Sequence, residues 1–169
     1  ALPHARPSHR VLESGQLVLL DFGGMLDGYC VDLTRVATLG SPSDEATRWH
    51  RAVQDAHAAA LRAVRPGVSA EDVDSAAREA LVAHGLAEAF SHGTGHGLGI
   101  EVHEAPRIGK RREPSDAEAA APIRAGMVFT VEPGVYLPSR GGIRLEDDLV
   151  VTDTGFELLT NVPLDLRVV

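Results

Sequence analysis

The chain has 169 residues, a typical size for one domain that buries roughly two thirds of its unfolded surface. Its formal net charge of −8 argues against a nucleic-acid-binding surface, and no apolar run approaches the ~20 residues that span a bilayer. The single cysteine, Cys30, allows no internal disulfide, and the N-terminal residues lack the layout of a signal peptide. We therefore expect a cytoplasmic protein that binds neither nucleic acid nor membranes.

Two strands joined by a tight turn are expected near the start of the chain. Gln16–Asp21 is typical of a buried strand, and a second strand is expected over Tyr29–Leu39. If Asp27-Gly28 forms a two-residue turn, Asp21 and Asp32 lie on one face of the hairpin, within reach of a common ion. An odd loop length would put these two carboxylates on opposite faces.

Two helices are expected next, as scaffold. Ser41-Pro42 is expected to cap the first helix, and Pro66-Gly67 to end it. The second helix is expected to begin at Ser69, with Asp72 forming a capping box, and to end at His84-Gly85. The apolar stripe of the first helix is Trp49, Val53, Ala56, Ala60 and Val64. Surface or capping roles are expected for the histidines of these helices, His50, His57 and His84.

A glycine-rich segment, SHGTGHGLGI at residues 91–100, holds four glycines around His92 and His96. Glycine makes a helix costly here, at about 1 kcal/mol each relative to alanine, so the two histidines are expected to have separate roles. The segment resembles a phosphate-binding loop only superficially, because no helix-forming sequence follows it. Val102-His103 is instead expected to continue as a strand.

The last third of the chain predicts one irregular connection and two strands. Pro106–Pro122 is polar and alanine-rich, which is typical of a surface loop. Gly126–Glu132 alternates as a strand that ends at Glu132. A further strand is expected over Gly141–Val151, with Arg144 beside Glu146 on one face.

Five candidate metal donors lie in glycine-rich or β-forming stretches: Asp21, Asp32, His96, Glu132 and Glu146. Four carboxylates and one imidazole are too many for a single structural zinc ion, which prefers sulfur and nitrogen. They suit two divalent cations that share bridging oxygens. Oxygen-rich ligation favours Mn²⁺, although Zn²⁺ or Co²⁺ fits the same donors. The residues alone therefore predict dinuclear metal hydrolysis.

Six motifs in order carry a resemblance to one known family. They are Asp21-x-Gly23, Gly28-Tyr29-x-x-Asp32-Leu33-Thr34-Arg35, His92-Gly-x-Gly-His96-Gly-x-Gly, Val102-His103-Glu104-x-Pro106, Thr130-Val131-Glu132-Pro133-Gly134-x-Tyr136 and Gly142-Ile143-Arg144-x-Glu146-Asp147. Together they resemble the pita-bread metallopeptidases, in particular the Xaa-Pro peptidases, prolidase and aminopeptidase P. The resemblance implies an α+β pita-bread (creatinase/aminopeptidase) fold, a curved antiparallel sheet with helices on its outer face. It also implies that residues 1–169 are a catalytic metallopeptidase domain.

The resemblance assigns roles to the donors. It implies that Asp21 binds one metal ion, that His96 and Glu132 bind the other, and that Asp32 and Glu146 bridge the two. A metal-bridging hydroxide would then attack the peptide bond that precedes proline in a small peptide substrate. Glu132 is also implied to pass the water's proton to the leaving nitrogen, which must be protonated.

Further residues are implied to contact the substrate. His4, His92 and His103 resemble the non-ligand histidines that hydrogen-bond substrate carbonyls and stabilise the tetrahedral intermediate. Arg107 resembles an arginine that meets the free carboxylate of a dipeptide, and Arg144 is also taken as substrate-binding. The lengthened loop over Lys110–Ala121 leaves dipeptidase and aminopeptidase activities both open, with the dipeptidase preferred.

The pattern departs from the family at its start, because an N-terminal domain and several catalytic-domain elements usually precede the position of Ala1. We expect an N-terminally truncated domain whose exposed apolar surface is covered by a complementing N-terminal segment or chain. A homodimer is expected of the full-length protein. Initiator methionine aminopeptidases share the five donors and are one alternative, although Asp32–Arg35 and Ile143–Asp147 favour the Xaa-Pro branch. Creatinase-like amidinohydrolases share the fold but replace metal donors, so the full donor set counts against them. A catalytically silent pita-bread module that binds peptides is the third alternative.

Overall fold

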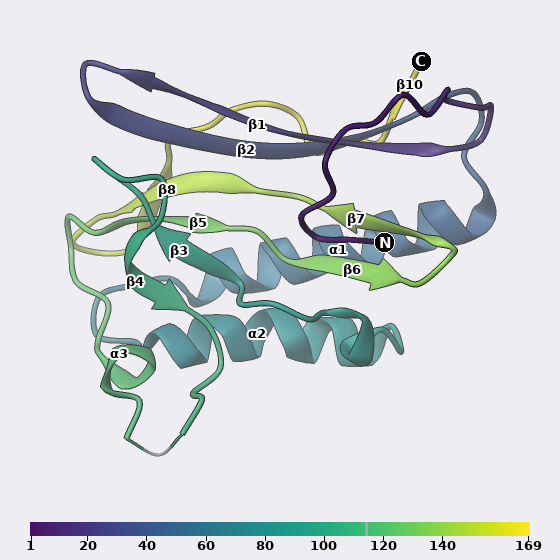
Figure 1. Cartoon of the computed structure of the whole chain (residues 1–169). Helices are drawn as coiled ribbons and strands as arrows, with labels where there is room; N and C mark the ends of the chain where they lie inside the picture. Colours follow the sequence, from purple (N-terminus) through teal and green to yellow (C-terminus); the bar gives the residue numbers. More distant parts are fainter. Residues whose placement is uncertain (114) are drawn as a thin grey trace.

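A long β-hairpin, a middle layer of shorter strands and a layer of helices make up the fold (Figure 1). The computed structural model describes residues 1–113 and 115–169. The hairpin consists of β1 (Leu17–Leu26) and β2 (Tyr29–Thr38). Its two turn residues, Asp27 and Gly28, have φ angles of 52° and 88°. Positive φ at both positions is the geometry of the two-residue turn that matches the twist of paired strands, which is why Asp-Gly is favoured there.

The hairpin register places the first two candidate donors together. Asp21 pairs with Thr34, and Gly23 pairs with Asp32. Because side chains alternate between the two faces of a strand, Asp21 and Asp32 share a face, as the two-residue turn predicts.

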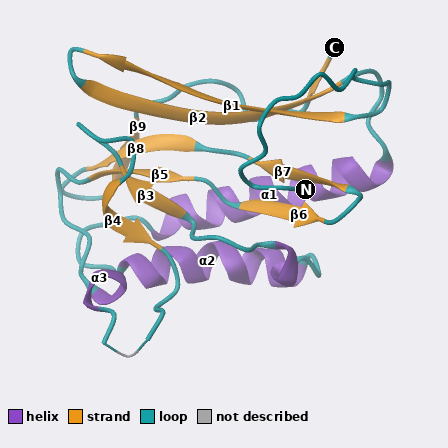
Figure 2. Cartoon of the chain, viewed as in Figure 1, coloured by secondary structure: helices purple, strands orange, loops and turns teal. Residues whose placement is uncertain are grey.

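The shorter strands form two further sheets (Figure 2). The larger sheet is antiparallel and has the order β4-β3-β5-β8-β9, from β4 (Glu104–Ile108), β3 (Gly95–Gly97), β5 (Val128–Val131), β8 (Asp147–Val151) and β9 (Phe156–Leu158). The smaller one pairs β6 (Gly134–Leu137) with β7 (Gly141–Arg144). β10 (Arg167–Val168) joins β2 in parallel, and a bridge between Thr34 and Glu146 connects the hairpin to the middle layer.

Two long helices cover the outer side of the middle layer (Figure 1). They are α1 (Asp44–Ala63) and α2 (Ala70–Ala83), and the short helical turns are η1 (Ala87–Ala89) and α3 (Ala117–Ala120). The prediction of a cap at Ser41-Pro42 was wrong by two residues. The cap is Ser43, since its Oγ accepts from the Ala46 amide at 3.1 Å. The Ser69–Asp72 capping box and the positive φ of Gly85 after α2 are confirmed.

The apolar core lies between these helices and the middle strands. The expected stripe of α1 is buried and packs in one cluster with Phe129, Ile143, Leu145 and Leu149. The same face also buries His50 and His57, so the expectation of surface or capping roles was wrong for both. His57 Nε2 lies 3.2 Å from Asp147 Oδ2 on β8. His84 does cap α2, beside Asp55.

Three strand and loop predictions need correction. The strand expected over residues 141–151 is two strands, because the chain leaves β6 after Arg144 and pairs with β5 from Asp147. Val102-His103 is not a strand, and β4 begins at Glu104. The connection expected over residues 106–122 is not wholly irregular, since it contains the end of β4 and α3, with Ile108 and Ala119 buried. Pro114 within it lies outside the described residues.

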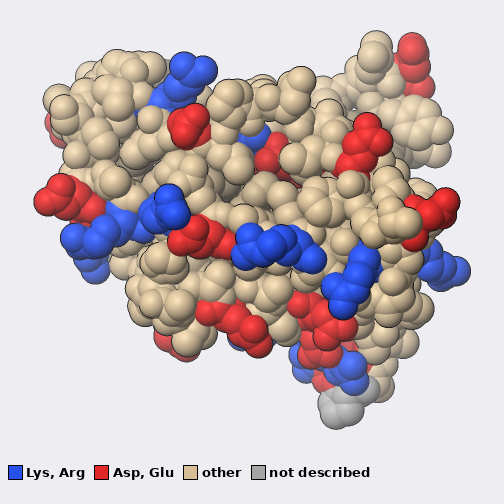
Figure 3. Space-filling model, turned by 180° about the vertical axis from the view of Figure 1, so that it is seen from behind, with Lys and Arg blue, Asp and Glu red and all other residues tan. Residues whose placement is uncertain are grey.

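One face of the hairpin exposes large apolar side chains: Leu20, Phe22, Leu26, Tyr29 and Val31. Met25 is also exposed, but it lies on the opposite face, which carries Asp21. Met25 and Leu26 are 65% and 78% exposed, respectively. Acidic and basic side chains are interspersed on the face seen in Figure 3. Among the described residues, no helix has both the length and the apolar composition needed to cross a membrane.

Candidate metal centre

Three of the five candidate donors converge from three separate elements. Asp32 on β2, His96 on β3 and Glu146 between β7 and β8 each offer one ligand atom, and these atoms lie within 4.8 Å of one another. The close approach of β3 depends on glycine: a Cβ at Gly95 would stand 1.8 Å from the carbonyl oxygen of Thr130. The glycines beside His96 therefore let its strand pack directly on β5.

Glu132 is the fourth donor and lies directly after β5. Its Oε1 is 3.6 Å from Nε2 of His96. Its backbone amide donates to the carbonyl of Thr94 at 2.7 Å, which ties the end of β5 to the glycine-rich segment. The position of this carboxylate next to His96 suits two groups that bind one cation.

Asp21 is the fifth donor and is the most exposed, with 46% of its side chain accessible. Its Oδ2 is ion-paired with Nη2 of Arg144. Asp21 also lies close enough to Asp32 for its charge to raise the Asp32 pKa, after the larger effect of burial. The structure thus brings all five predicted donors to one side of the hairpin, although Asp21 has an arginine as its partner.

Arg144, taken from the sequence as substrate-binding, is buried and occupied by groups of the protein. Besides Asp21, it donates to the Tyr136 hydroxyl at 3.1 Å and to the Pro3 carbonyl at 3.0 Å. Its Nε lies 3.7 Å from Glu132 Oε2. In this arrangement Arg144 holds two of the acidic donors and the N-terminal segment, so any effect on substrate would pass through them.

Burial and mutual repulsion raise the pKa values of the acidic donors. Desolvation raises the pKa of Glu146 to about 9, with contributions from the charges of Glu132 and Asp32. Desolvation also raises the pKa of Glu132 to about 7, against the opposing charge of Arg144. Carboxylates crowded into a poorly solvated space favour a protonated state unless a cation compensates them. This is the electrostatic behaviour expected of a divalent metal site, and the residues therefore fit such ions.

The imidazole of His96 is prepared as a ligand. Its Nδ1 lies 3.1 Å from the carbonyl oxygen of Gly97, so the proton sits on Nδ1 and the lone pair of Nε2 faces Glu132. Burial lowers the His96 pKa, which keeps the ring neutral. A neutral ring with a fixed tautomer is the form that binds metal.

The non-ligand histidines surround the donors in different ways. His92 donates from Nδ1 to the Gly93 carbonyl, and its Nε2 accepts from the Tyr136 hydroxyl at 2.8 Å. Burial lowers the His92 pKa to about 4, so the ring is neutral and its Nε2 carries no proton for an oxyanion. His103 is exposed, and its ring centroid lies 4.1 Å from that of His96. His4 is exposed, and its charge contributes to the lowered His92 pKa.

Arg107 lies opposite His96 in the β3–β4 register. Its Nη2 is 2.5 Å from Asp116 Oδ2, and its Nη1 donates to the Lys110 carbonyl at 3.0 Å. The guanidinium expected to meet a substrate carboxylate is therefore paired with a carboxylate of the lengthened loop.

Thr34, Tyr136 and Asp148 are residues to which the sequence assigned no role. Thr34 donates from Oγ1 to Glu146 Oε2 at 2.6 Å, and Asp148 Oδ2 accepts from the Asp32 amide at 3.0 Å. Burial raises the Asp148 pKa to about 6. Strand periodicity was the available signal, since Thr34 shares a face with Asp32 and Asp148 shares one with Glu146.

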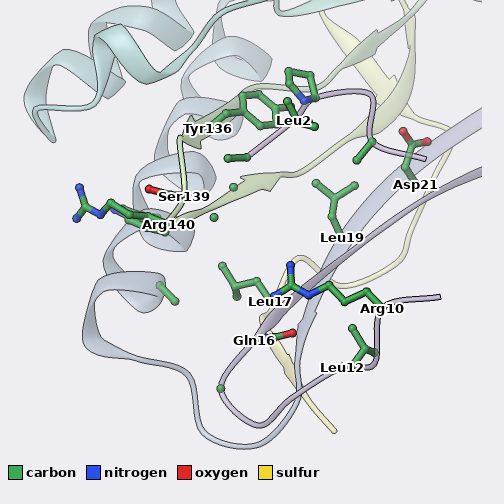
Figure 4. A pocket seen from close by; sticks show the side chains of 18 of the residues that line it. Leu2, Arg10, Leu12, Gln16, Leu17, Leu19, Asp21, Tyr136, Ser139 and Arg140 are labelled. Carbon is green, nitrogen blue, oxygen red and sulfur yellow. The ribbon is translucent and has the colours of Figure 1, made fainter. Parts of the chain in front are cut away.

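A cavity of about 760 Å³ opens beside Asp21 and Tyr136 (Figure 4). It is bounded by the N-terminal segment, the start of β1 and residues 139–142. His4 is among the residues that line it. Asp21 is the one donor in its lining, and the space is large enough for a small peptide.

The α+β layers and the convergent carboxylates and imidazole define a metallopeptidase of the pita-bread fold. A family model described as metallopeptidase family M24 matches residues 1–153. The chain belongs to that family. Membership of a metallopeptidase family implies divalent metal ions, in agreement with the donor cluster of Asp32, His96 and Glu146.

Individual relatives are similar over almost the whole chain. An Xaa-Pro dipeptidase of Pyrococcus horikoshii is 38% identical over 166 residues, which is 98% of this chain and 45% of the relative. The structure of an X-Pro aminopeptidase from Thermotoga maritima matches with a TM-score of 0.93 and 42% identity, over 99% of this chain and 46% of that one. Dipeptidase PepE from Mycobacterium ulcerans matches with a TM-score of 0.92 and 45% identity, over 98% and 43%. The chain thus spans less than half the length of these relatives.

Proposed function

We propose that residues 1–169 are a catalytic domain that hydrolyses the peptide bond preceding proline in small peptides, in the cytoplasm. The convergence of Asp32, His96 and Glu146, with Glu132 beside them, carries this proposal. The names of the similar proteins, an Xaa-Pro dipeptidase and an X-Pro aminopeptidase, support the choice of substrate.

The proposed cofactor is a pair of divalent cations, with Mn²⁺ favoured by the oxygen-rich donor set. Asp21, Asp32, His96, Glu132 and Glu146 would hold them. When bound, two such ions activate a water molecule and polarise the carbonyl of the scissile bond. Cations would also release the acidic donors from the protonated state that burial favours.

Glu132 is the proposed group that moves a proton during hydrolysis. Its carboxylate lies beside His96, with Oε1 3.6 Å from Nε2, so a water molecule activated at the site would lie within reach of one of its oxygens. The leaving nitrogen of an Xaa-Pro bond has no hydrogen of its own and must be protonated before it departs. Glu132 would deliver that proton, taken from the attacking water.

His103 is the proposed donor to the developing oxyanion. It is exposed, and its ring lies beside that of His96, with the two centroids 4.1 Å apart. His92 has its Nε2 occupied by the Tyr136 hydroxyl, so its proposed role is to hold Tyr136 and, through it, Arg144 in place beside the substrate. His4, held near the site by the N-terminal segment, is a third proposed substrate contact.

Arg107 and the loop around Asp116 are proposed to set the substrate length. An arginine pairs bidentately with a carboxylate, and Asp116 takes that place here. The free carboxylate of a dipeptide would exchange with Asp116, which favours a dipeptidase. Faster cleavage of an Xaa-Pro tripeptide than of the matching dipeptide would contradict this preference.

The proposed activity is tested on the purified chain supplied with Mn²⁺. Release of the N-terminal residue from Ala-Pro is expected, with at least 10²-fold slower release after Glu132→Gln, because proton transfer by a positioned group contributes 10²–10⁴-fold. Glu157→Gln makes the same charge change on exposed β9 and is the control. Equal rates for the two variants would contradict the assignment of Glu132.

The exposed face of the hairpin is proposed to be covered in the working enzyme by a complementing N-terminal polypeptide, within a homodimer. Large apolar patches on a soluble protein mark contact surfaces, and the relatives are more than twice as long as this chain. Light scattering of the isolated chain is expected to show self-association that Leu26→Lys with Phe22→Lys reduces. A monodisperse monomer before any substitution would contradict the proposal.

A further inference from the structure

A buried ion pair on α2 lies apart from the metal donors. Asp74 is fully buried, and Arg78 one helical turn later donates to its Oδ2 from Nε at 2.6 Å. The remaining carboxylate oxygen, Oδ1, accepts from the Thr94 amide at 3.0 Å and from Thr94 Oγ1 at 2.8 Å. Asp74 therefore connects the helix to the glycine-rich segment as well as to its arginine.

Arg78 contacts the same segment at a second place. Its Nη1 donates to the Phe90 carbonyl at 3.0 Å, and its Nη2 donates to the His92 carbonyl at 2.5 Å. The guanidinium carbon also lies 4.3 Å from the centre of the Phe90 ring. Together the two side chains hold residues 90–94 by three hydrogen bonds to the backbone and one to the Thr94 hydroxyl.

This segment leads directly into the site. The Thr94 carbonyl accepts from the Glu132 amide at 2.7 Å, and His96 follows two residues later. The His92 ring meets the Tyr136 hydroxyl, which Arg144 also contacts. A shift of residues 90–94 would therefore displace Glu132 and the His92–Tyr136 pair together.

Stability alone does not explain the pair. Replacing a buried ion pair with groups that leave no charge unpaired is often neutral for stability, because desolvation offsets the attraction between the charges. A guanidinium that bonds one carboxylate and two carbonyls instead fixes a single backbone geometry.

We propose that Asp74 and Arg78 are positioning residues that hold residues 90–94 and so place Glu132 and His92 for peptide hydrolysis. The inference rests on the proposed function wherever activity is its readout. A displacement of about 1 Å at a reacting group costs about 10²-fold in rate, which sets the expected size of the effect.

The first test replaces the pair by neutral amides, Asp74→Asn with Arg78→Gln, which keeps an acceptor for Thr94 and leaves no unpaired charge. We expect kcat for Ala-Pro to fall by about 10- to 100-fold, with KM changed less than about 3-fold and bound metal unchanged. Arg78→Lys keeps the charge but cannot reach all three acceptors, so it should recover only part of the rate. Arg51→Gln with Asp55→Asn removes an Arg–Asp pair of the same i,i+4 spacing from the exposed face of α1, and it should leave kcat unchanged.

A double-mutant cycle separates positioning from general weakening. In a His92→Ala background, the amide pair should lower kcat by clearly less than in the wild type, because part of its effect passes through His92. Effects on kcat that multiply fully in the double variant, or a wild-type kcat in the amide-pair variant, would overturn the inference.

Amide hydrogen exchange tests the placement without any activity. Faster exchange is expected at residues 91–94 and at Glu132 in the amide-pair variant, with β8 unchanged. If the wild type cleaves no Xaa-Pro peptide, the proposed function fails and exchange alone decides this inference. Unchanged exchange at both places would then overturn it.

Discussion

Single side chains in the site are prepared for their roles by burial and by one or two hydrogen bonds each. His96 has its tautomer fixed by the Gly97 carbonyl, and Glu132 has its pKa raised to about 7 mainly by desolvation. His92 and His103 are both predicted to act on the substrate, but their environments differ. Tyr136 occupies the Nε2 of His92, whereas His103 is exposed. The two histidines should therefore respond differently to substitution.

His103→Ala is expected to lower kcat by about 10²-fold, the scale of one lost oxyanion donor. Metal content should not change, because His103 is not one of the five donors. Steady-state kinetics and metal analysis of the same preparation check both statements. Loss of metal from the variant would show that His103 is a ligand and that its assigned role is wrong.

The strands place the site residues in two ways: by the register of the hairpin, and by the change of partner strand between β7 and β8. The hairpin turn fixes which face of β2 carries Asp32 and Thr34, and the break between β7 and β8 brings Glu146 to Thr34. Thr34 is fully buried and donates to Glu146 Oε2 at 2.6 Å, while its Oγ1 accepts from Arg144 Nε at 3.2 Å. One hydroxyl thus orients the proposed bridging carboxylate.

Thr34→Val keeps the volume of the side chain and removes this hydroxyl. We expect metal affinity to fall by about 10- to 100-fold, as for other groups that orient a ligand. Thr34→Ser should retain most of the affinity, since it keeps the oxygen. Calorimetric titration with Mn²⁺ compares the three proteins, and equal affinities for valine and threonine would exclude an orienting role.

The same elements show what sequence can predict. Asp27-Gly28 determines the turn type locally, so the shared face of Asp21 and Asp32 followed from the residues. The break at residues 145–146 did not, because the alternation of side chains continues through it while the partner strand changes from β6 to β5. The pairing of Arg107 with Asp116 also depends on a loop whose path no local pattern determines.

At the scale of the whole molecule, the acidic centre makes stability depend on pH when no cation is bound. The pKa values of Glu132 and Glu146 are raised from 4.5 to about 7 and about 9 in the folded chain. Above about pH 4.5, the folded state holds protons that the unfolded state has released. The contribution of these two groups to the free energy of unfolding is therefore full below about pH 4.5, and it is lost as pH rises through their pKa values in the folded chain. The lowered pKa values of His50, His92 and His96 act in the opposite direction, but only below about pH 6.5.

Between pH 7 and pH 9, the free energy of unfolding of the chelator-treated chain is therefore expected to fall. The expected loss is up to about 1.4 kcal/mol per pH unit for each proton that unfolding releases. Urea midpoints at the two pH values measure this loss. Glu146→Gln should flatten the dependence, and Mn²⁺ should reverse it by favouring the charged carboxylates. An unchanged slope in the glutamine variant would show that Glu146 does not carry the effect.

Binding of two divalent cations by the five donors is the central claim, and titration of the purified, chelator-treated chain with Mn²⁺ measures it most directly. We predict two ions per chain for the wild type, with the stoichiometry or affinity strongly reduced by Asp32→Asn and by Glu146→Gln. The control Glu157→Gln should bind as the wild type does. Failure to bind Mn²⁺, Zn²⁺ or Co²⁺, or binding that survives both substitutions unchanged, would contradict the account.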